Sequence, residues 1–192
     1  MRVTRAQAEE NHQAVINVAS KLFREHGFDG IGLKDLMKGA GLTQGGFYKQ
    51  FASKEDLIGQ ASARAMEMAT RRWSEAVASN PDAPLEAVTA FYLSPEHLNR
   101  KGEGCPIVAL GADAARQGAE VRAQFEVGMR EHLRMLTEMT GSAGENRPSD
   151  KAMAVLSLMV GALTLSRAVN DNALAQGLLE AAARQVREIA AG

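Results

Sequence analysis

The sequence predicts an all-α protein of about nine helices, and three observations predict this fold class. First, apolar residues recur at helical spacing along most of the chain, as Leu33, Leu36 and Met37 do. Second, glycine and proline separate these stretches, and none of them shows the convincing alternation of a strand. Third, residues 33–51 hold two short helical patterns separated by a tight turn. The predicted architecture is an N-terminal three-helix, helix-turn-helix unit followed by a larger helical region.

Composition places the chain among ordinary globular proteins. Of its 192 residues, 45 % are apolar and 23 % are charged, which is enough to bury a core without disulfides. The net charge of −1 does not indicate a protein that coats nucleic acid. However, residues 1–55 carry a net charge of +2 and residues 56–192 a net charge of −3. This distribution is compatible with nucleic-acid binding by the N-terminal part.

The cysteine count and the apolar stretches bear on localisation. Cys105 is the single cysteine, so an internal disulfide is excluded and a zinc site is not expected. The N-terminal residues lack the apolar segment of a signal peptide. The most apolar stretch, residues 152–165, is interrupted by polar and small residues and is expected to be too short to cross a membrane. We therefore expect a cytoplasmic protein.

The first helix is predicted to run from about residue 7 or 9 to His26, with Gly27 as its stop. Phe28 is expected to fix the following loop onto the core. Residues 1–8 are basic, and we expect them to fray rather than to reach a minor groove as an arm. The inward stripe of the helix is predicted to comprise Val15, Val18, Ala19 and Leu22, with Ile16 and Phe23 beside it.

The two short helices that follow form the helix-turn-helix pattern. Gly41 is predicted to take a positive φ in the turn. Thr43 is expected to cap the second helix through its hydroxyl. Phe47 and Phe51, four residues apart, are predicted to point into the core. The opposite, polar face then presents Gln44, Gly45, Tyr48 and Lys49.

Four sequence segments, found together in register, carry a family resemblance: KLFREHGFDG, KDLMKGAGLT, TQGGFYKQF and SKEDL. Through them, residues 15–58 resemble the N-terminal domain of TetR/AcrR-type transcriptional repressors. The resemblance implies a DNA-binding domain at residues 8–55, which we call the head, with the helix-turn-helix at about 33–51. It also implies a helical ligand-binding and dimerisation domain at residues 56–192, which we call the body. The body supports the resemblance by length and helical character alone.

By this resemblance and by its chemistry, the segment at residues 43–51 is the predicted recognition helix. Gln44 is the candidate for reading a base, since its amide can pair with both N6 and N7 of adenine. Thr43, Tyr48 and Lys49 are the candidates for phosphate contacts. Without the surrounding motif, Gln44 and Lys49 would be interpreted as solvated surface residues.

Glycines in this region indicate close approach to a partner. Gly45 and Gly46 each cost about 1 kcal/mol inside a helix, an expense that is reasonable if DNA must approach the backbone. Gly32 stands before the second helix, where members of the family usually carry Thr or Ser as a cap and phosphate contact. That contact is in doubt here, and Lys34 is expected to supply more of the local attraction.

The fourth helix is predicted to link the two domains. It begins at Ser53, where Ser-Lys-Glu-Asp matches a capping box, and ends at Asn80. Its N-terminal amides and Lys54 are expected to face a phosphate. The loop at 141–148 is expected to be exposed or disordered. Further helices are predicted at residues 84–99, with a break at Ser94-Pro95, and at 106–117, 119–140, 149–169 and 172–190.

The last two helices are apolar on more than one side, which predicts that something outside the protomer covers them. Small residues at 154, 157, 161 and 162 would let another helix approach closely. In the family, this helix pair forms a four-helix bundle with a second copy, so the resemblance implies a homodimer. The predicted inward faces comprise Leu156, Met159, Val160 and Leu163 on one helix and Leu174, Leu178, Ala182, Val186 and Ile189 on the other.

Cys105 is the candidate for redox sensing. At a helix start, with Arg100 and Lys101 close in sequence, its thiol is expected to have a lowered pKa. Its Gly-Cys-Pro context also resembles a branch of the family that includes sensors of electrophiles and oxidants. The alternative is a small buried apolar residue. A ligand pocket, or alternatively plain core, is expected among Trp73, Phe91, Tyr92, Met129, His132 and Met159.

Together these features predict a homodimeric transcriptional repressor, released from a palindromic operator by a small-molecule ligand or by modification of Cys105. Its expected partners are double-stranded DNA, a second copy and an unidentified effector, with no cofactor, metal or membrane. One alternative is a DNA-bound interaction protein or activator without a ligand. The other is a helical enzyme whose head only resembles a regulator, but no catalytic motif supports it, so we predict no enzymatic activity.

Overall fold

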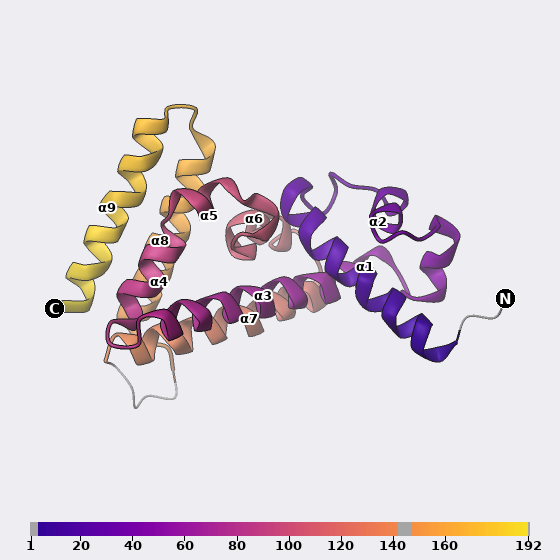
Figure 1. Ribbon diagram of the computed structural model, residues 1–192, viewed down its shortest axis with the longest axis horizontal. Coiled ribbons are helices and arrows are strands. Elements are labelled where there is room, and N and C mark those ends of the chain that lie inside the picture. The colour runs from indigo at the N-terminus through magenta and orange to yellow at the C-terminus, as the bar shows by residue number, and fades with distance from the viewer. Residues whose placement is uncertain (1–3, 142–146, 192) are drawn as a thin grey trace.

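The computed structural model describes residues 4–141 and 147–191. These residues form nine α-helices and two short 3-10 helices and contain no strand, which confirms the all-α prediction (Figure 1). Residues 1–3 of the predicted arm and 142–146 of the predicted loop lie outside the described ranges. The elements run in the order α1 (Arg5–His26), α2 (Leu33–Gly39), η1 (Gln44–Lys49), α3 (Lys54–Ser79), α4 (Pro84–Tyr92), α5 (Pro95–Asn99), η2 (Lys101–Glu103), α6 (Pro106–Ala114), α7 (Ala119–Met139), α8 (Asp150–Ala168) and α9 (Asn172–Ala191).

The helices form an elongated molecule with the head at one end (Figure 1). α1, α2 and η1 gather there, and α3 and α7 pack along each other from the head into the body. α8 and α9 pack together at the opposite end, and α6 lies between them and the head. A movement in the body can therefore reach the head along α3 or through α6.

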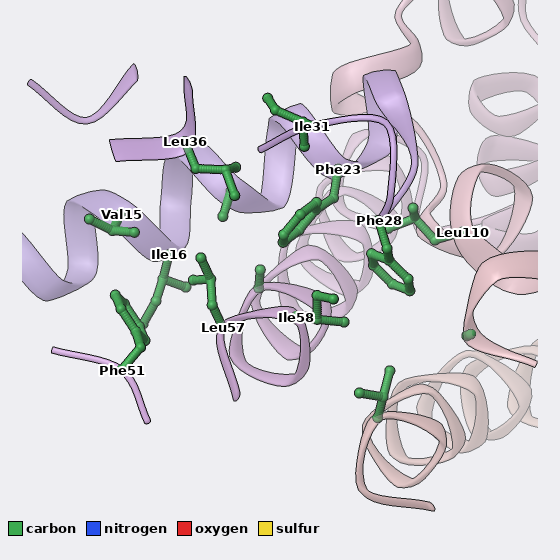
Figure 2. Close-up of a cluster of buried hydrophobic side chains, with 14 of the residues drawn as sticks. Val15, Ile16, Phe23, Phe28, Ile31, Leu36, Phe51, Leu57, Ile58 and Leu110 are labelled. Atoms are coloured by element: carbon green, nitrogen blue, oxygen red, sulfur yellow. The ribbon is translucent and has the colours of Figure 1, made fainter. Parts of the chain in front are cut away.

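Two clusters of buried apolar side chains hold the fold together. The first fills the head, where Phe28 meets Phe23 edge to face at 5.4 Å, in line with its predicted role (Figure 2). Leu110 on α6 joins this cluster, so a helix of the body completes the core of the head. The second cluster fills the body. α3 contributes Leu57 to the first and Trp73 to the second, while the boundary between the two domains stays a prediction.

α1 starts earlier than the sequence predicts because Thr4 caps it. The Thr4 hydroxyl accepts a hydrogen bond from the Gln7 amide at 3.2 Å. Val18 and Leu22, predicted as part of the inward stripe, are only partly buried, and a Cβ at Gly39 would lie 2.8 and 3.3 Å from them. They face the end of α2 rather than the centre of the head. The fully buried stripe of α1 comprises Val15, Ile16, Ala19 and Phe23.

The predicted recognition helix is shorter and tighter than expected. It is a 3-10 helix at Gln44–Lys49 instead of an α-helix over residues 43–51. Thr43 occupies the cap position, but its side chain accepts no capping hydrogen bond within the described chain. Two adjacent glycines lower the propensity for an α-helix, and 3-10 geometry is common in such short pieces. Gly41 has the predicted positive φ, 72°.

α3 begins with half of the predicted capping box. The Ser53 hydroxyl accepts from the Asp56 amide at 3.1 Å, but the Asp56 carboxylate accepts from the Ala52 amide at 2.9 Å rather than from the cap residue. Further along, α3 and α7 approach closely. A Cβ at Gly128 would lie 2.5 Å from the Met66 side chain, so only glycine fits this crossing. The absent side chain of Gly128 thus lets α3 and α7 pack closely along each other.

The breaks in the body follow its prolines. α5 restarts at Pro95, where the Ser94 hydroxyl accepts from the amide of His97 at 3.1 Å. Pro106 occupies the first position of α6 as predicted, but α6 ends at Ala114, earlier than the expected Gln117.

α8 is longer than the apolar stretch considered in the sequence. Its 19 residues, Asp150–Ala168, have the length and composition of a membrane span, so the expectation that it is too short is wrong. In the fold it packs on α7 and α9 and buries Val155, Met159 and Leu163 in the body core. The core helix of a soluble protein can meet the same length and composition test, so this one helix is weak evidence for a membrane span.

The outer faces of α8 and α9 are partly apolar. Leu174, predicted to point inward, is 51 % exposed because α9 packs through a neighbouring stripe. Met153 and Leu165 on α8 are 42 % and 55 % exposed. Ala154 and Ser157 are also exposed, whereas Ala162 is buried inside the protomer. The buried stripe of α9 comprises Ala175, Leu179, Ala182 and Val186.

Candidate functional site

The outer face of η1 carries the predicted polar residues. Phe47 and Phe51 are buried and stack at 5.4 Å, which confirms their predicted direction. They hold η1 against the head core, so that the other face of η1 stays free. Tyr48 is 74 % exposed. The exposed set comprises Thr43, Gln44, Gly45, Tyr48 and Lys49.

The two glycines of η1 differ in their surroundings. A Cβ on Gly45 would have open space within 4 Å among the described residues. A Cβ on Gly46 would face the Met37 side chain at 3.7 Å, inside the head. The open space that close approach of a partner would need is therefore present at Gly45 and not at Gly46, while the approach itself stays a prediction.

Two predicted basic contacts have different environments. Lys34 is exposed in the first turn of α2, behind Gly32, which caps the helix without a side-chain bond in the described structure. Lys54 is partly buried, and its ammonium group donates to the Ile31 carbonyl at 3.1 Å. Lys54 therefore braces the loop before α2, with its other two protons available to a partner.

A network that the sequence did not suggest supports the end of η1. The His12 ring stacks on Phe51 at 4.5 Å, with 18° between the planes. His12 Nε2 lies 3.0 Å from Gln60 Oε1, and Gln60 Nε2 donates to the Asp56 carboxylate at 2.8 Å. A single histidine on a helix gives no sequence signal for such a role, because its partners come from another helix.

The body holds a small cavity of about 10 Å³ where α3, α4, α6 and α7 meet. Four of the six predicted pocket residues line it, but Met129 and Met159 do not. The space is at the lower limit for one water molecule. The lining residues are Ala69, Arg72, Trp73, Phe91, Tyr92, His97, Glu103, Gly104, Cys105, Ile107, His132 and Leu156.

His132 is the most unusual residue of this lining. It is 1 % exposed, and neither ring nitrogen has a hydrogen-bond partner within the described chain. Its ring packs on Trp73 at 4.4 Å. Burial lowers the pKa of His132 from 6.5 to about 4, so the ring is neutral near pH 7. Leaving a buried polar atom unpaired costs about 1–3 kcal/mol.

The prediction of a lowered pKa for Cys105 is wrong. The residue is 4 % exposed, and burial raises the pKa of its thiol. The nearby Tyr92 hydroxyl offsets part of this rise in pKa, although it does not form a hydrogen bond of regular geometry. Arg100, expected to favour the thiolate, instead pairs with Glu96 and Glu103 at the surface. The thiol is therefore a poor nucleophile in this conformation.

The peptide unit between Gly104 and Cys105 connects the cavity to the head. Its carbonyl accepts from Arg24 Nη1 on α1 at 3.0 Å, and its N–H donates to His97 Nε2 at 2.9 Å. The other His97 nitrogen lies 2.7 Å from the Tyr92 carbonyl, so Nδ1 carries the proton. Arg24 is 5 % exposed, and burial is the main reason that its pKa is lowered to about 10. Sequence periodicity did not indicate this buried arginine.

A second polar contact joins α6 to the head. The Asp113 carboxylate near the end of α6 accepts from the Phe28 amide at 3.2 Å. Arg167 on α8 donates to the carbonyls of His97 and Leu98, which fixes the loop that precedes Cys105. No three His, Cys, Asp or Glu side chains of the described residues group as metal ligands would.

Together, an exposed helix-turn-helix face at one end and a small, largely apolar cavity in the body define the class, a helix-turn-helix regulatory protein. Residues 15–61 match the family model described as "Bacterial regulatory proteins, tetR family". The chain is 25 % identical to the HTH-type transcriptional repressor NemR of Escherichia coli over 165 residues, 80 % of this chain and 82 % of NemR. It is 36 % identical to the HTH-type transcriptional regulator AcrR of Shigella flexneri over 59 residues, 31 % of this chain and 27 % of AcrR.

Solved structures share the fold over nearly the whole chain. The crystal structure of the reduced form of E. coli NemR matches with a TM-score of 0.76 at 22 % identity, covering 93 % of this chain and 96 % of that one. A TetR-family transcriptional regulator from Cytophaga hutchinsonii matches with a TM-score of 0.80 at 17 % identity, covering 100 % and 98 %. Residues 15–61 therefore match the TetR family of bacterial regulatory proteins, and the chain as a whole has the fold of solved TetR-family regulators.

Proposed function

We propose that this protein is a homodimeric transcriptional repressor that binds a palindromic operator and leaves it when an effector enters the body cavity. The observation that carries the proposal is the free polar face of η1, held outward by Phe47 and Phe51. Its similarity to NemR, which is named a transcriptional repressor, supports the direction of control. We expect it to act in the cytoplasm, where the operator is.

On DNA, the two copies of η1 enter successive major grooves about 34 Å apart. Gln44 reads a base edge, while Thr43, Tyr48 and Lys49 contact phosphates and set the register. Lys34 adds local attraction, and Lys54 contributes through its remaining protons. The open space over Gly45 lets the backbone approach the floor of the groove.

Dimerisation is proposed through the outer faces of α8 and α9. Met153, Leu165 and Leu174 supply exposed apolar area there. Ala154 and Ser157 are small and exposed, so they allow a second helix to come close. A two-fold protein also matches a palindromic operator, because each half-site needs one head.

Release follows from the contacts between the cavity and the head. Because the cavity has room for one water molecule at most, an effector must widen it, and it then touches His97 and Cys105, whose peptide contacts hold the Arg24 side chain of α1. An effector that favours a body conformation without this contact changes the angle of the head. A tenfold change in operator affinity needs a difference of about 1.4 kcal/mol between the two conformations.

Modification of Cys105 is a second proposed route to release. An added group on the buried sulfur would not fit in a cavity of about 10 Å³ and would push on the Gly104–Cys105 peptide. Because burial raises the pKa of the thiol, this route requires the body to open first and is slow. Cys105→Ser is expected to abolish the response to an alkylating agent, and full operator affinity after complete alkylation would rule out the route.

The test of the proposed function is selection of bound sequences from random duplex DNA. We expect an enriched palindrome, bound by a dimer, and a salt dependence typical of several phosphate contacts. A monomer that binds no duplex at low salt would contradict the proposal. The palindrome then serves as the target in a screen for molecules that release it.

A further inference from the structure

Two buried polar side chains of the cavity lack regular hydrogen bonds. Both nitrogens of His132 and the hydroxyl of Tyr92 are without such a partner in the described part of the chain. Each residue is 1 % exposed, so water at the surface cannot pair with them. The Tyr92 hydroxyl lies near the Cys105 thiol, which is a weak donor and acceptor. Most buried polar atoms in proteins are paired, so this cluster requires an explanation.

The unpaired atoms can be satisfied by a ligand group that both donates and accepts hydrogen bonds. A neutral imidazole has one nitrogen that donates and one that accepts, and the tyrosine hydroxyl can do either. His132 is neutral at pH 7 because burial lowers its pKa to about 4. A hydroxyl group can donate to one of these atoms and accept from another, whereas a carbonyl can only accept. A hydroxyl on the ligand therefore satisfies more of the cluster.

The walls around the cluster favour a flat, uncharged molecule. The Trp73 ring lies 4.4 Å from His132 and 5.9 Å from Tyr92, and Phe91 forms another wall. Aromatic walls pack well on another ring. The one ion pair at the edge, between Arg72 and Glu103, is already complete at 3.3 Å. A carboxylate or ammonium group would enter without a free counter-charge among these lining residues.

An outer cleft supplies the volume that the inner cavity lacks. It has about 510 Å³ between α3, α4 and α5, within the range of small-molecule pockets. Arg72, Phe91 and His97 line both the cleft and the inner cavity. Phe91 is half-buried and stacks on His97 at 5.6 Å, so it stands between the two spaces. For a ring to reach His132 from the cleft, the Phe91 side chain would have to swing aside.

We infer that the effector is an uncharged ring compound of the phenol class, whose hydroxyl group binds to His132 and Tyr92 while the rest of the molecule lies in the outer cleft. The inference rests on the proposed function, since it names the ligand of the proposed effector cavity. Binding itself, however, can be measured without DNA.

Trp73 provides a direct signal, because it is the single tryptophan of the chain and it lines the cavity. The experiment titrates the full-length protein with four probes and follows tryptophan fluorescence, excited where phenols do not absorb. The probes are 4-ethylphenol, its methyl ether, 4-ethyltoluene and 4-ethylbenzoate. We expect the phenol to bind roughly tenfold more tightly than the ether or the hydrocarbon, and the carboxylate not to bind. Equal binding of phenol and hydrocarbon, or no binding of the phenol, overturns the inference.

Substitution of His132 and of Tyr92 tests whether these two residues bind the hydroxyl group of the ligand. His132→Leu keeps the apolar bulk and loses no regular hydrogen bond, so we expect it to fold. It should weaken phenol binding roughly tenfold and leave binding of the hydrocarbon unchanged. Tyr92→Phe is a second variant with the same expected direction. His26→Leu, at an exposed position on α1, is the matched control and should bind like the wild type.

The outcomes separate the two proposals. If His132→Leu and Tyr92→Phe both keep the wild-type affinity for the phenol, the inference is wrong. A protein that binds its operator but not the phenol overturns the ligand class alone. A protein that binds the phenol through His132 but no duplex supports the site and contradicts the proposed function.

Discussion

The face of η1 and the body cavity treat their polar groups in opposite ways. On η1 the polar groups are exposed, with Tyr48 at 74 %, and water pairs with them until a partner arrives. In the cavity, His132 is 1 % exposed and its nitrogens have no partner within the described residues. We infer from this difference that a hydrated polar surface is sufficient to bind a large charged partner. A small ligand is selected by groups that are costly to leave unpaired.

The largest expected effect contrasts two adjacent residues of η1. Phe47→Ala removes a fully buried ring from the head core and should lower the free energy of unfolding by about 3–5 kcal/mol. Tyr48→Ala should change stability by less than about 0.5 kcal/mol yet weaken DNA binding. Thermal unfolding and a gel-shift assay measure the two effects. Equal loss of stability in both variants would contradict the two-faced arrangement of η1.

The next effect concerns pH and the cavity. The unfolded chain protonates His132 near its ordinary pKa of 6.5, but burial lowers the pKa in the folded protein to about 4. Between these values the unfolded chain binds more protons, so stability falls as the pH falls, by about 3 kcal/mol at pH 4. Well above pH 6.5, where His132 is unprotonated in both the folded and the unfolded chain, the residue contributes no pH dependence.

Urea unfolding at several pH values checks this expectation. His132→Leu should lose less stability than the wild type between pH 6.5 and pH 4. Burial also lowers the pKa of His97 to about 4, so the loss of stability due to His97 remains in both the variant and the wild type. His26→Leu is the exposed control. An unchanged pH profile in His132→Leu would show that the residue is not buried in solution.

Loss of the Arg24 contact that connects the head to the body cavity should have a smaller effect on stability. Arg24→Met removes hydrogen bonds to the carbonyls of Ser20 and Gly104, and we expect a loss of about 2 kcal/mol in stability. It should also make operator binding less sensitive to the effector. Arg71→Met, at an exposed position of α3, is the control and should change little. The measurements are urea unfolding and operator binding with and without effector, and a normal effector response would place the coupling elsewhere.

On the DNA side, Gln44→Ala should relax the preference at one position of each half-site. A bidentate contact to a base is worth about 1–3 kcal/mol of discrimination. The measurement compares the affinities of the variant for the operator and for single-base changes. The same preference in wild type and variant would remove Gln44 from the reading face.

The smallest expected effect separates a phosphate contact from a base contact. Lys49→Ala should weaken binding to all duplexes alike and reduce the salt slope by about 0.9 for each lost phosphate contact, or about 1.8 for a dimer that loses one contact per head. Affinities measured over a range of salt concentrations give this slope. If the variant instead changed sequence preference, Lys49 would be a base-reading residue.

Much of the fold could be predicted because it depends on local patterns. The positions of prolines and glycines predicted the helix breaks at Ser94 and Gly118. The spacing of Phe47 and Phe51 predicted which face of η1 is buried. The same reasoning misjudged the hydroxyl of Thr43, because 3-10 geometry replaced the expected α-helix. It also misjudged the Cys105 thiol. Closeness in sequence suggested cations beside it, but burial by other helices decides its pKa.

The sequence by itself determined the class of fold, the position of the helix-turn-helix and the outward face of η1, since these follow from the order and spacing of residues along the chain. Only the tertiary structure decided that His132, Tyr92 and Cys105 share one cavity and that Arg24 holds the neighbouring peptide. The physical reason is that burial and hydrogen-bond partners depend on helices that are distant in sequence. A local pattern can predict a helix and its apolar face, but not what the neighbouring helices bring against it.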